Sequence, residues 1–373
     1  MWKKLGELFD LQMGKTPSRD NSLYWHGNNK WVSIADLSKS GKFISETKET
    51  ISDLGVTESG IKKVDKDTVI MSFKLSVGKS AITADDMYTN EAIMAFNDRN
   101  ILPIDKEWLY YYLSNFDWSK TGNKAVKGIT LNKAILKDIS INVPDLSEQR
   151  KIVARLTRLD RLYDYFCQQI VNLDQLVKSR FIEMFADTPK GVLSDVATIK
   201  MGQSPDGKTY NDEGNGTAFY QGKTEFGDLY IGAPTTWTTA PTRFAEANDV
   251  LMSVRAPVGS TNIAVEQCCL GRGLAGIRPI EGKSTTMFIL YSMRSIENQI
   301  EGMGVGSTFK AINKDQVYKL PIPIADLDKQ ARFVKIAEQS DKSKFIFQLS
   351  LMYCTMIAKY LRRGWLTCLI LAF

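Results

Sequence analysis

The sequence predicts an α/β (α+β) protein in which two similar globular domains are joined by two long antiparallel helices. Three observations predict this fold. Much of the chain occurs twice, each copy opens with short β-branched segments between turn residues, and each copy closes with a heptad pattern. Such a chain has a pseudo-twofold internal repeat.

The repeat is visible in separate blocks of sequence. Residues 5–17 (LGELFDLQMGKTP) return as residues 193–205 (LSDVATIKMGQSP), 188 positions later. Residues 69–74 (VIMSFK) return as residues 250–255 (VLMSVR), now 181 positions later, and this second offset persists to the end of each copy. We therefore divide the chain into globular domain 1–146, helix 147–190, globular domain 191–327 and helix 328–373.

Composition places the chain in a broad class. It has 373 residues, of which 43% are hydrophobic, and a net charge of +6, which permits a polyanionic partner without requiring one. The five cysteines form no C-x-x-C motif, and the apolar end at residues 365–373 is shorter than the roughly 20 residues that span a bilayer. We expect a cytoplasmic protein.

Within each globular domain, β-branched runs bounded by Gly, Asn, Asp and Ser predict strands. The predicted strands are residues 30–34, 68–74, 91–96, 250–255 and 273–278, and the predicted short helices are residues 108–116 and 286–293.

The first long helix follows residues 144–149 (PDLSEQ), where Ser147 is a plausible N-cap, and no Pro or Gly interrupts the chain before Pro189. Its apolar residues are spaced alternately by four and three positions, which is an a/d heptad seam. The seam consists of Ile152, Leu156, Leu159, Tyr163, Phe166, Ile170, Leu173 and Val177. A helix of about 37 residues would be roughly 55 Å long.

The second copy supplies a partner for this seam. The equivalent positions, 181 residues later, are Phe333, Ala337, Ser340, Lys344, Phe347, Leu351, Cys354 and Ala358, and most are apolar or small. We predict that the two helices pack antiparallel as a coiled-coil rod, with Phe333, Ala337, Phe347 and Leu351 on the seam. The alternative is that each helix packs on its own globular domain.

Residues 202–209 (GQSPDGKT) match the pattern of a phosphate-binding P-loop, G-x-x-x-x-G-K-[ST]. A true P-loop needs a helix directly after it, but residues 210–216 (YNDEGNG) are rich in turn formers. The first copy lacks the pattern. With a single histidine, His26, multi-histidine metal sites are excluded, and we expect no catalytic, cofactor-binding or metal-binding residues.

Side chains suited to DNA are easier to find, since Lys and Arg bind phosphates and guanine edges while Gln binds adenine. They lie in Gly-rich loops or at predicted strand ends, although any one of them could equally be a solvated surface residue. The first copy offers Lys15, Thr16, Ser18, Arg19, Lys74, Lys79, Lys124 and Lys127. The second copy offers Gln203, Ser204, Lys208, Tyr210, Gln221, Lys223, Arg255, Arg272, Thr308 and Lys310.

Several blocks together resemble a known family. They are residues 13–18 (MGKTPS), 131–133 (LNK) and 143–153 (VPDLSEQRKIV), joined in the second copy by 202–205 (GQSP), 220–223 (YQGK), 249–259 (DVLMSVRAPVG) and 271–275 (GRGLA). With the order globule, helix, globule, helix, this is similar to the specificity subunit of type I restriction-modification systems. The resemblance covers nearly the whole chain.

The resemblance implies a function. Each globule would be a target recognition domain that reads one half of a split site in double-stranded DNA, and the helices would set the gap and dock methyltransferase subunits. Restriction and translocase subunits would complete the complex. S-adenosylmethionine, ATP and magnesium would belong to those partners, so this chain would be a non-catalytic recognition subunit without a cofactor of its own.

Two departures and two alternatives stand beside this reading. Residues 353–373 look unlike the family, and Gly364 should weaken the helix there. Between Ser18 and Asp67 the first copy carries seven more residues than the second, which predicts an asymmetric target. The alternatives are a P-loop nucleotide hydrolase using Gly202–Thr209, and a coiled-coil interaction protein without a nucleic-acid role.

Overall fold

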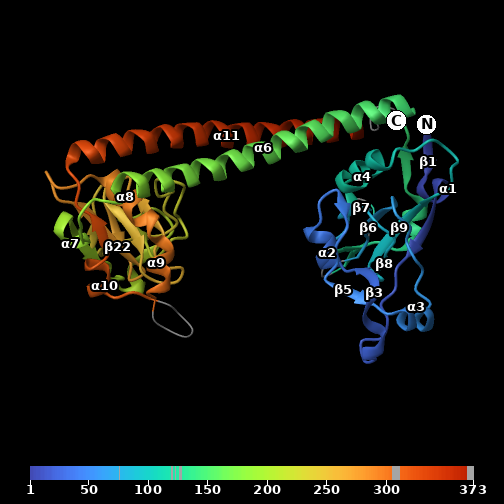
Figure 1. Cartoon of the computed structure of the whole chain (residues 1–373), viewed down its shortest axis with the longest axis horizontal. Helices are drawn as coiled ribbons and strands as arrows, with labels where there is room; N and C mark the ends of the chain where they lie inside the picture. Colours follow the sequence, from blue (N-terminus) through green and yellow to red (C-terminus); the bar gives the residue numbers. More distant parts are fainter. Residues whose placement is uncertain (75, 119–120, 122, 126–127, 305–310, 368–373) are drawn as a thin grey trace. The chain divides into compact units, whose positions relative to one another are not determined.

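The computed structural model describes residues 1–74, 76–118, 121, 123–125, 128–304 and 311–367, with backbone only for 123–125, 128–130 and 359–367. The chain forms two compact units. One contains Met1–Asp164 together with the segment from Met352 onward, and the other contains Tyr165–Leu351. Each unit holds one globular domain and part of both long helices (Figure 1).

The first domain is built on a five-stranded sheet in the order β2-β9-β6-β7-β4, beside a three-stranded sheet β5-β3-β8 and the pairs β1-β12 and β10-β11. Its strands are β1 (Trp2–Lys4), β2 (Phe9–Met13), β3 (Trp25–Val32), β4 (Phe43–Ile44), β5 (Glu49–Ile51), β6 (Val69–Ser72), β7 (Ser80–Thr83), β8 (Tyr88–Thr89), β9 (Ile93–Asp98), β10 (Asn123–Ala125), β11 (Gly128–Thr130) and β12 (Ser140–Asn142). Its helices are α1 (Leu5–Leu8), η1 (Ser22–Tyr24), α2 (Ile34–Lys39), α3 (Asp53–Ser59), α4 (Lys106–Asn115) and α5 (Lys133–Asp138).

The second domain repeats the central sheet as β14-β22-β19-β20, beside a five-stranded sheet β15-β17-β16-β21-β18 and the pair β13-β23. Its strands are β13 (Lys190–Val192), β14 (Ala197–Met201), β15 (Tyr210–Asn211), β16 (Thr217–Tyr220), β17 (Trp237–Thr238), β18 (Phe244–Ala245), β19 (Val250–Ser253), β20 (Thr261–Ile263), β21 (Cys268–Leu270), β22 (Leu274–Pro279) and β23 (Pro321–Pro323). Its helices are α7 (Leu193–Val196), η3 (Gly207–Thr209), α8 (Thr286–Ser295), α9 (Glu297–Gly302) and α10 (Lys314–Tyr318).

Both faces of each central sheet are buried, because alternate side chains of a strand point to opposite faces. In β6, Val69 and Met71 join the cluster that packs under α4, whereas Ile70 joins the cluster on the other face. In β19, Val250 and Met252 separate from Leu251 in the same way. The predicted internal repeat is therefore also a repeat of core packing.

The two long helices are α6 (Leu146–Phe185) and α11 (Leu327–Thr367). Within the second unit they run antiparallel, because contacts rise along α11 as they descend along α6 (Figure 1). The contacts are Phe181 with Phe333 (ring centroids 5.2 Å apart), Asp174 Oδ1 with Lys344 Nζ (3.0 Å) and Phe166 with Phe347 (5.7 Å). The antiparallel pairing predicted from the heptads is confirmed there.

The ends of the predicted seam pack on the globular domains instead. Ile152 and Leu156 belong to the core of the first domain, and their equivalents Phe333 and Ala337 belong to the core of the second. Both of the alternatives for the helices are thus realised, each over a different part of the seam. A buried glutamine secures each junction: Gln149 Nε2 donates to the carbonyls of Pro103 and Pro144, and Gln330 Nε2 donates to those of Lys283 and Ala325.

The rest of the predicted seam is only partly buried. Leu159, Phe166, Ile170, Leu173, Phe347 and Leu351 are half-buried, and Val177 is buried in the core of the second domain. Tyr163 is 45% exposed, so its assignment to the seam is wrong, whereas its equivalent Lys344 is 8% exposed.

Three local expectations also differ from the structure. Asp145 caps the first long helix, because its Oδ1 accepts from the amide of Glu148, and Ser147 lies inside the helix. The predicted strand 30–34 ends at Val32, since Ser33 caps α2. The backbone of α11 stays helical through Gly364 to Thr367.

Candidate nucleic-acid interface

Each domain holds a short loop against a turn of its own sheet, and the two copies use the same backbone hydrogen bonds. After β2, the amides of Gly14 and Lys15 donate to the carbonyls of Ile93 and Thr89. After β14, the amides of Gly202 and Gln203 donate to those of Leu274 and Leu270, the positions 181 residues later. The sequence repeat is therefore a shared framework around two equivalent loops.

The glycine in each loop is required by this close approach. A Cβ on Gly14 would lie 2.2 Å from the carbonyl oxygen of Thr89, and a Cβ on Gly202 would lie 2.1 Å from that of Gly271. Any larger residue would separate the loop from the turn. The residues after the glycine are thereby fixed beside the turn between β8 and β9, or between β21 and β22.

In the second domain this arrangement borders an open pocket of about 700 Å³. The pocket brings together five of the predicted DNA-binding residues, namely Ser204, Gln221, Lys223, Arg255 and Arg272. They come from four separate segments: the loop after β14, the loop after β16, the end of β19 and the β21–β22 turn. The backbone amide of Arg272 donates to Ser204 Oγ over 3.2 Å, which joins two of these segments.

The pocket has a cationic and hydrogen-bonding character. Its remaining lining residues are Gly222, Thr224, Ser253, Ala256, Pro257 and Gly273, so no carboxylate faces its three cations. Lys223, Arg255 and Arg272 are exposed, and among the described residues none of them forms an ion pair. Such a site suits phosphate oxygens and the acceptor edge of guanine.

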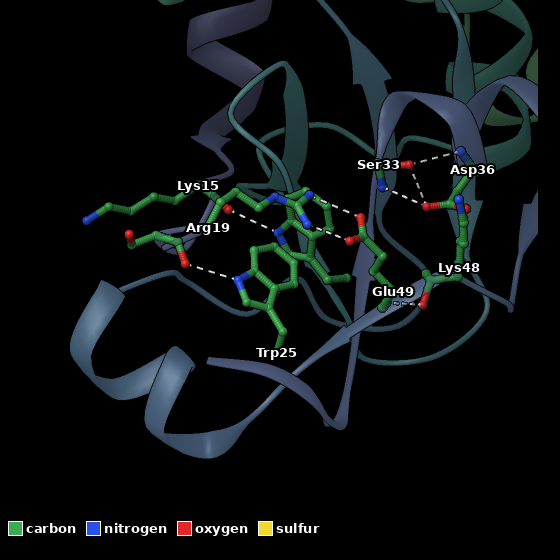
Figure 2. A network of polar contacts seen from close by, with 10 residues as sticks. Lys15, Arg19, Trp25, Ser33, Asp36, Lys48 and Glu49 are labelled. Carbon is green, nitrogen blue, oxygen red and sulfur yellow. Dashed lines mark hydrogen bonds and ion pairs between the residues drawn. The ribbon is translucent and has the colours of Figure 1, made fainter. Parts of the chain in front are cut away.

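In the first domain the corresponding loop carries a cation that is already paired. Arg19 and Glu49 point toward one another (Figure 2), with Nη1–Oε1 and Nη2–Oε2 distances of 2.5 and 3.0 Å. The guanidinium lies 3.8 Å from the ring centroid of Trp25 and 5.2 Å from that of Trp31. The hydrogen bond from Arg19 lowers the pKa of Glu49, and the pKa of Arg19 is raised in turn.

The two tryptophans also hold the loop itself. Trp31 Nε1 donates to the carbonyl of Lys15 over 3.1 Å, and Trp25 Nε1 donates to that of Ser18 over 3.0 Å. Because the indoles are edge-to-face, with centroids 5.1 Å apart, they form a rigid base under residues 15–19.

The other predicted residues of the first domain are spread more widely. The ammonium groups of Lys15 and Lys79 donate to the carbonyl of Ser59 and to Ser38 Oγ, and Thr16 Oγ1 donates to Glu91. Lys74, the equivalent of Arg255, follows β6. Lys124 lies in β10, where only the backbone is described, and Lys127 lies outside the described residues, as do Thr308 and Lys310 in the second domain.

The P-loop alternative is wrong. Gly207–Thr209 forms a single 3-10 turn followed by β15, so no α-helix offers its N-terminus to a phosphate. The Asp206 carboxylate accepts from the amide of Lys208 over 3.0 Å, which places a negative charge where the phosphate would bind. Gln203, Lys208 and Tyr210 do not line the pocket, and Tyr210 instead stacks on Phe219 with centroids 4.8 Å apart.

Sequence reasoning missed two carboxylates of the first domain. Glu49 and Glu91 hold Arg19 and Thr16, but the search favoured cations and amides. The 181-residue offset could have found Glu91, because it pairs this residue with Arg272. Within the described ranges, no group of three metal-binding side chains occurs, and no helix could span a membrane.

Comparison with known proteins decides the family. A family model described as type I restriction modification DNA specificity domain matches residues 1–172 and 190–348. The chain belongs to this family. The two matched segments correspond to the two copies of the repeat, and they place it among type I specificity subunits.

Individual relatives agree with this assignment. A putative type I restriction enzyme specificity subunit of Methanocaldococcus jannaschii, MjaX, is 31% identical over 333 residues, covering 77% of each chain. A chain from a structural study of the assembly and conformational transition of a type I R-M system matches with a TM-score of 0.73 and 27% identity, over 98% of this chain and 97% of that one. The HsdS subunit of Thermoanaerobacter tengcongensis matches with a TM-score of 0.50 and 27% identity, over 98% and 95%.

The specificity-subunit function predicted from the sequence is thereby confirmed. In a type I restriction-modification complex this chain is the recognition component and not the catalytic one, and its partners are DNA and the other subunits of the complex.

Proposed function

We propose that this specificity subunit reads a bipartite, asymmetric site in double-stranded DNA, with one half-site contacted by each globular domain. The observation that carries the proposal is the pair of equivalent loops, which share their backbone hydrogen bonds but present different side chains. A common framework supports a common manner of docking, and unlike side chains support unlike half-sites.

The chemistry of each loop supports contact with DNA. In the second domain, Arg255 and Arg272 lie in one acid-free pocket with Gln221, a combination that suits purine edges and phosphates. In the first domain, the tryptophan base and the Glu49 carboxylate hold Arg19 in one orientation. Ordering these side chains before DNA binds reduces the entropy lost on binding.

We further propose that α6 and α11 set the gap between the half-sites and carry the docking surface for methyltransferase subunits. A helix of 40 residues is about 60 Å long, while half-sites read from one face of DNA lie roughly 34–36 Å apart. The hydrogen bonds from Gln149 and Gln330 support this role, because a spacer must be fixed to the domains it separates.

The remaining partners and cofactors follow from the same proposal. The complex contains methyltransferase subunits and restriction or translocase subunits, and it acts in the cytoplasm. S-adenosylmethionine, ATP and magnesium bind to those other subunits.

Two measurements test this function. The tagged chain is co-expressed with the methyltransferase subunit of its own system, and co-purification of the two is expected. The purified complex then methylates a random-sequence DNA library. Methylation confined to two short specified blocks with an unspecified gap is expected, and methylation without a bipartite motif would overturn the proposal.

A further inference from the structure

The two domains carry opposite charges at one equivalent position. Glu91 lies in the turn before β9, and Arg272 lies in the turn before β22. The carbonyls two residues before and after Glu91 accept from Lys15 and Gly14, and those two residues before and after Arg272 accept from Gln203 and Gly202. Both side chains are exposed, so the same backbone site presents an acceptor in one domain and a donor in the other.

A hydroxyl from the neighbouring loop contacts this site in both copies. Thr16 Oγ1 donates to Glu91 Oε2, and Ser204, which occupies the place of Thr16, accepts from the amide of Arg272. Among the described residues, Thr16 is the only hydrogen-bond partner of Glu91, which leaves Oε1 available. The Arg272 side chain borders the pocket that also contains Gln221 and Arg255.

A carboxylate at this place limits what Glu91 can contact. Phosphate oxygens offer no donor and repel it, so at a DNA surface Glu91 is tolerated only where it accepts a hydrogen bond. Exocyclic amino groups in the major groove are such donors, and cytosine N4 is the usual partner of Glu. Arginine instead donates two hydrogen bonds to O6 and N7 of guanine.

We propose that Glu91 and Arg272 are paired specificity-determining residues, with Glu91 accepting from the N4 amino group of a cytosine in one half-site and Arg272 donating to a guanine in the other. This proposal rests on the proposed function, since it presupposes one half-site for each domain. Thr16 is the positioning residue for Glu91, because its hydroxyl holds one carboxylate oxygen. Arg19, stacked on Trp25 nearby, supplies a compensating positive charge against the phosphates.

The test is the methylation motif of the complete methyltransferase complex on a random-sequence library, compared for the natural chain, Glu91→Gln, Arg272→Gln and Asp10→Asn. Asp10→Asn is the matched control, because it makes the same kind of change at the other end of β2, where Asp10 pairs with Asn97. Glu91→Gln preserves size, and thermal unfolding of each variant checks its folding.

We expect Glu91→Gln to reduce the preference for cytosine at one position of one half-site by about 5- to 150-fold, with adenine gaining, because Gln binds adenine. Arg272→Gln should reduce the preference for guanine at one position of the other half-site, and Asp10→Asn should leave the motif unchanged. Loss of adenine instead of cytosine preference at the Glu91 position would overturn the assignment of the base. Uniformly weaker methylation with an unchanged motif would show phosphate contacts only and would overturn the proposal. If the natural chain itself gave no bipartite motif, the proposed function would have failed instead.

Discussion

Tyr111 in α4 donates a hydrogen bond through its hydroxyl to Oδ2 of Asp160 in α6, over 2.6 Å. Their equivalents in the second unit, Tyr291 and Asp341, form the same bond. Burial raises the pKa of Tyr111, and the Asp160 carboxylate adds to the effect. Each globular domain is therefore attached to a long helix by the same pair of side chains.

Removing this hydroxyl should loosen the attachment. Tyr111→Phe is expected to lower the free energy of unfolding by about 1–2 kcal/mol, because the hydrogen bond has a charged acceptor but Asp160 can regain water. Urea unfolding measures the change. Tyr163→Phe is the control, since this tyrosine is 45% exposed on the same helix, and its effect should stay within about 0.5 kcal/mol. Equal effects of the two substitutions would refute the attachment.

The buried glutamine at each junction should matter more. Gln330→Met removes the partner of the Lys283 and Ala325 carbonyls and of Ser284 Oγ, and each orphaned buried group costs roughly 1–3 kcal/mol. A large drop in the unfolding midpoint is expected. Gln168→Met serves as control, because Gln168 is exposed and bonds only within its own helix to Asn172. A junction role is excluded if Gln330→Met is as mild as this control.

The antiparallel pairing of the helices can be measured as a coupling energy. Phe166→Ala and Phe347→Ala, singly and together, should show a coupling of about 0.5–1.5 kcal/mol, since their rings are in contact at 5.7 Å. The same cycle with Phe345, which is 59% exposed, should give additive effects. Additivity for the first pair would contradict the observed register.

A tyrosine next to this attachment predicts a pH dependence. Burial raises the pKa of Tyr112 to about 12, above the value of about 10 expected in the unfolded chain. The protonated form is favoured by folding, so its contribution to stability is complete below pH 10 and is lost as pH rises toward 12. Tyr112→Phe should therefore become more stable than the natural chain, relative to neutral pH, only above pH 10. An unchanged difference between pH 7 and pH 11.5 would exclude this titration.

The sequence predicted the framework better than the contacts made upon it. Gly14 and Gly202 could be recognised because the blocks around them repeat, and the backbone geometry they permit repeats with them. The heptad spacing predicted the helices, but a period of 3.5 residues does not say which neighbour covers a position. Ile152 therefore packs in its domain, and the seam position of Lys344 is filled by a cation paired with Asp174 and Asp228.

The pairing of Arg19 with Glu49 could not be predicted for another reason. Thirty residues separate the two in the chain, and only the folding of β5 beside β3 brings them together. Carboxylates also conflict with a simple expectation of positive charge at a DNA surface, which is why Glu91 was missed. Single-residue chemistry identified the pocket of the second domain, where the contacts are cationic, more completely than the loop of the first.

The central claim is that two separate domains read two half-sites across a gap set by α6 and α11. The most direct test removes one heptad around Phe166 from α6 and one around Phe347 from α11, and then maps the sequence that the methyltransferase complex modifies. Seven helical residues correspond to about 10 Å, or about three base pairs of DNA. The account predicts that both specified blocks persist while the gap between them shortens, by up to about three base pairs. A gap of unchanged length, with both blocks intact, would contradict it.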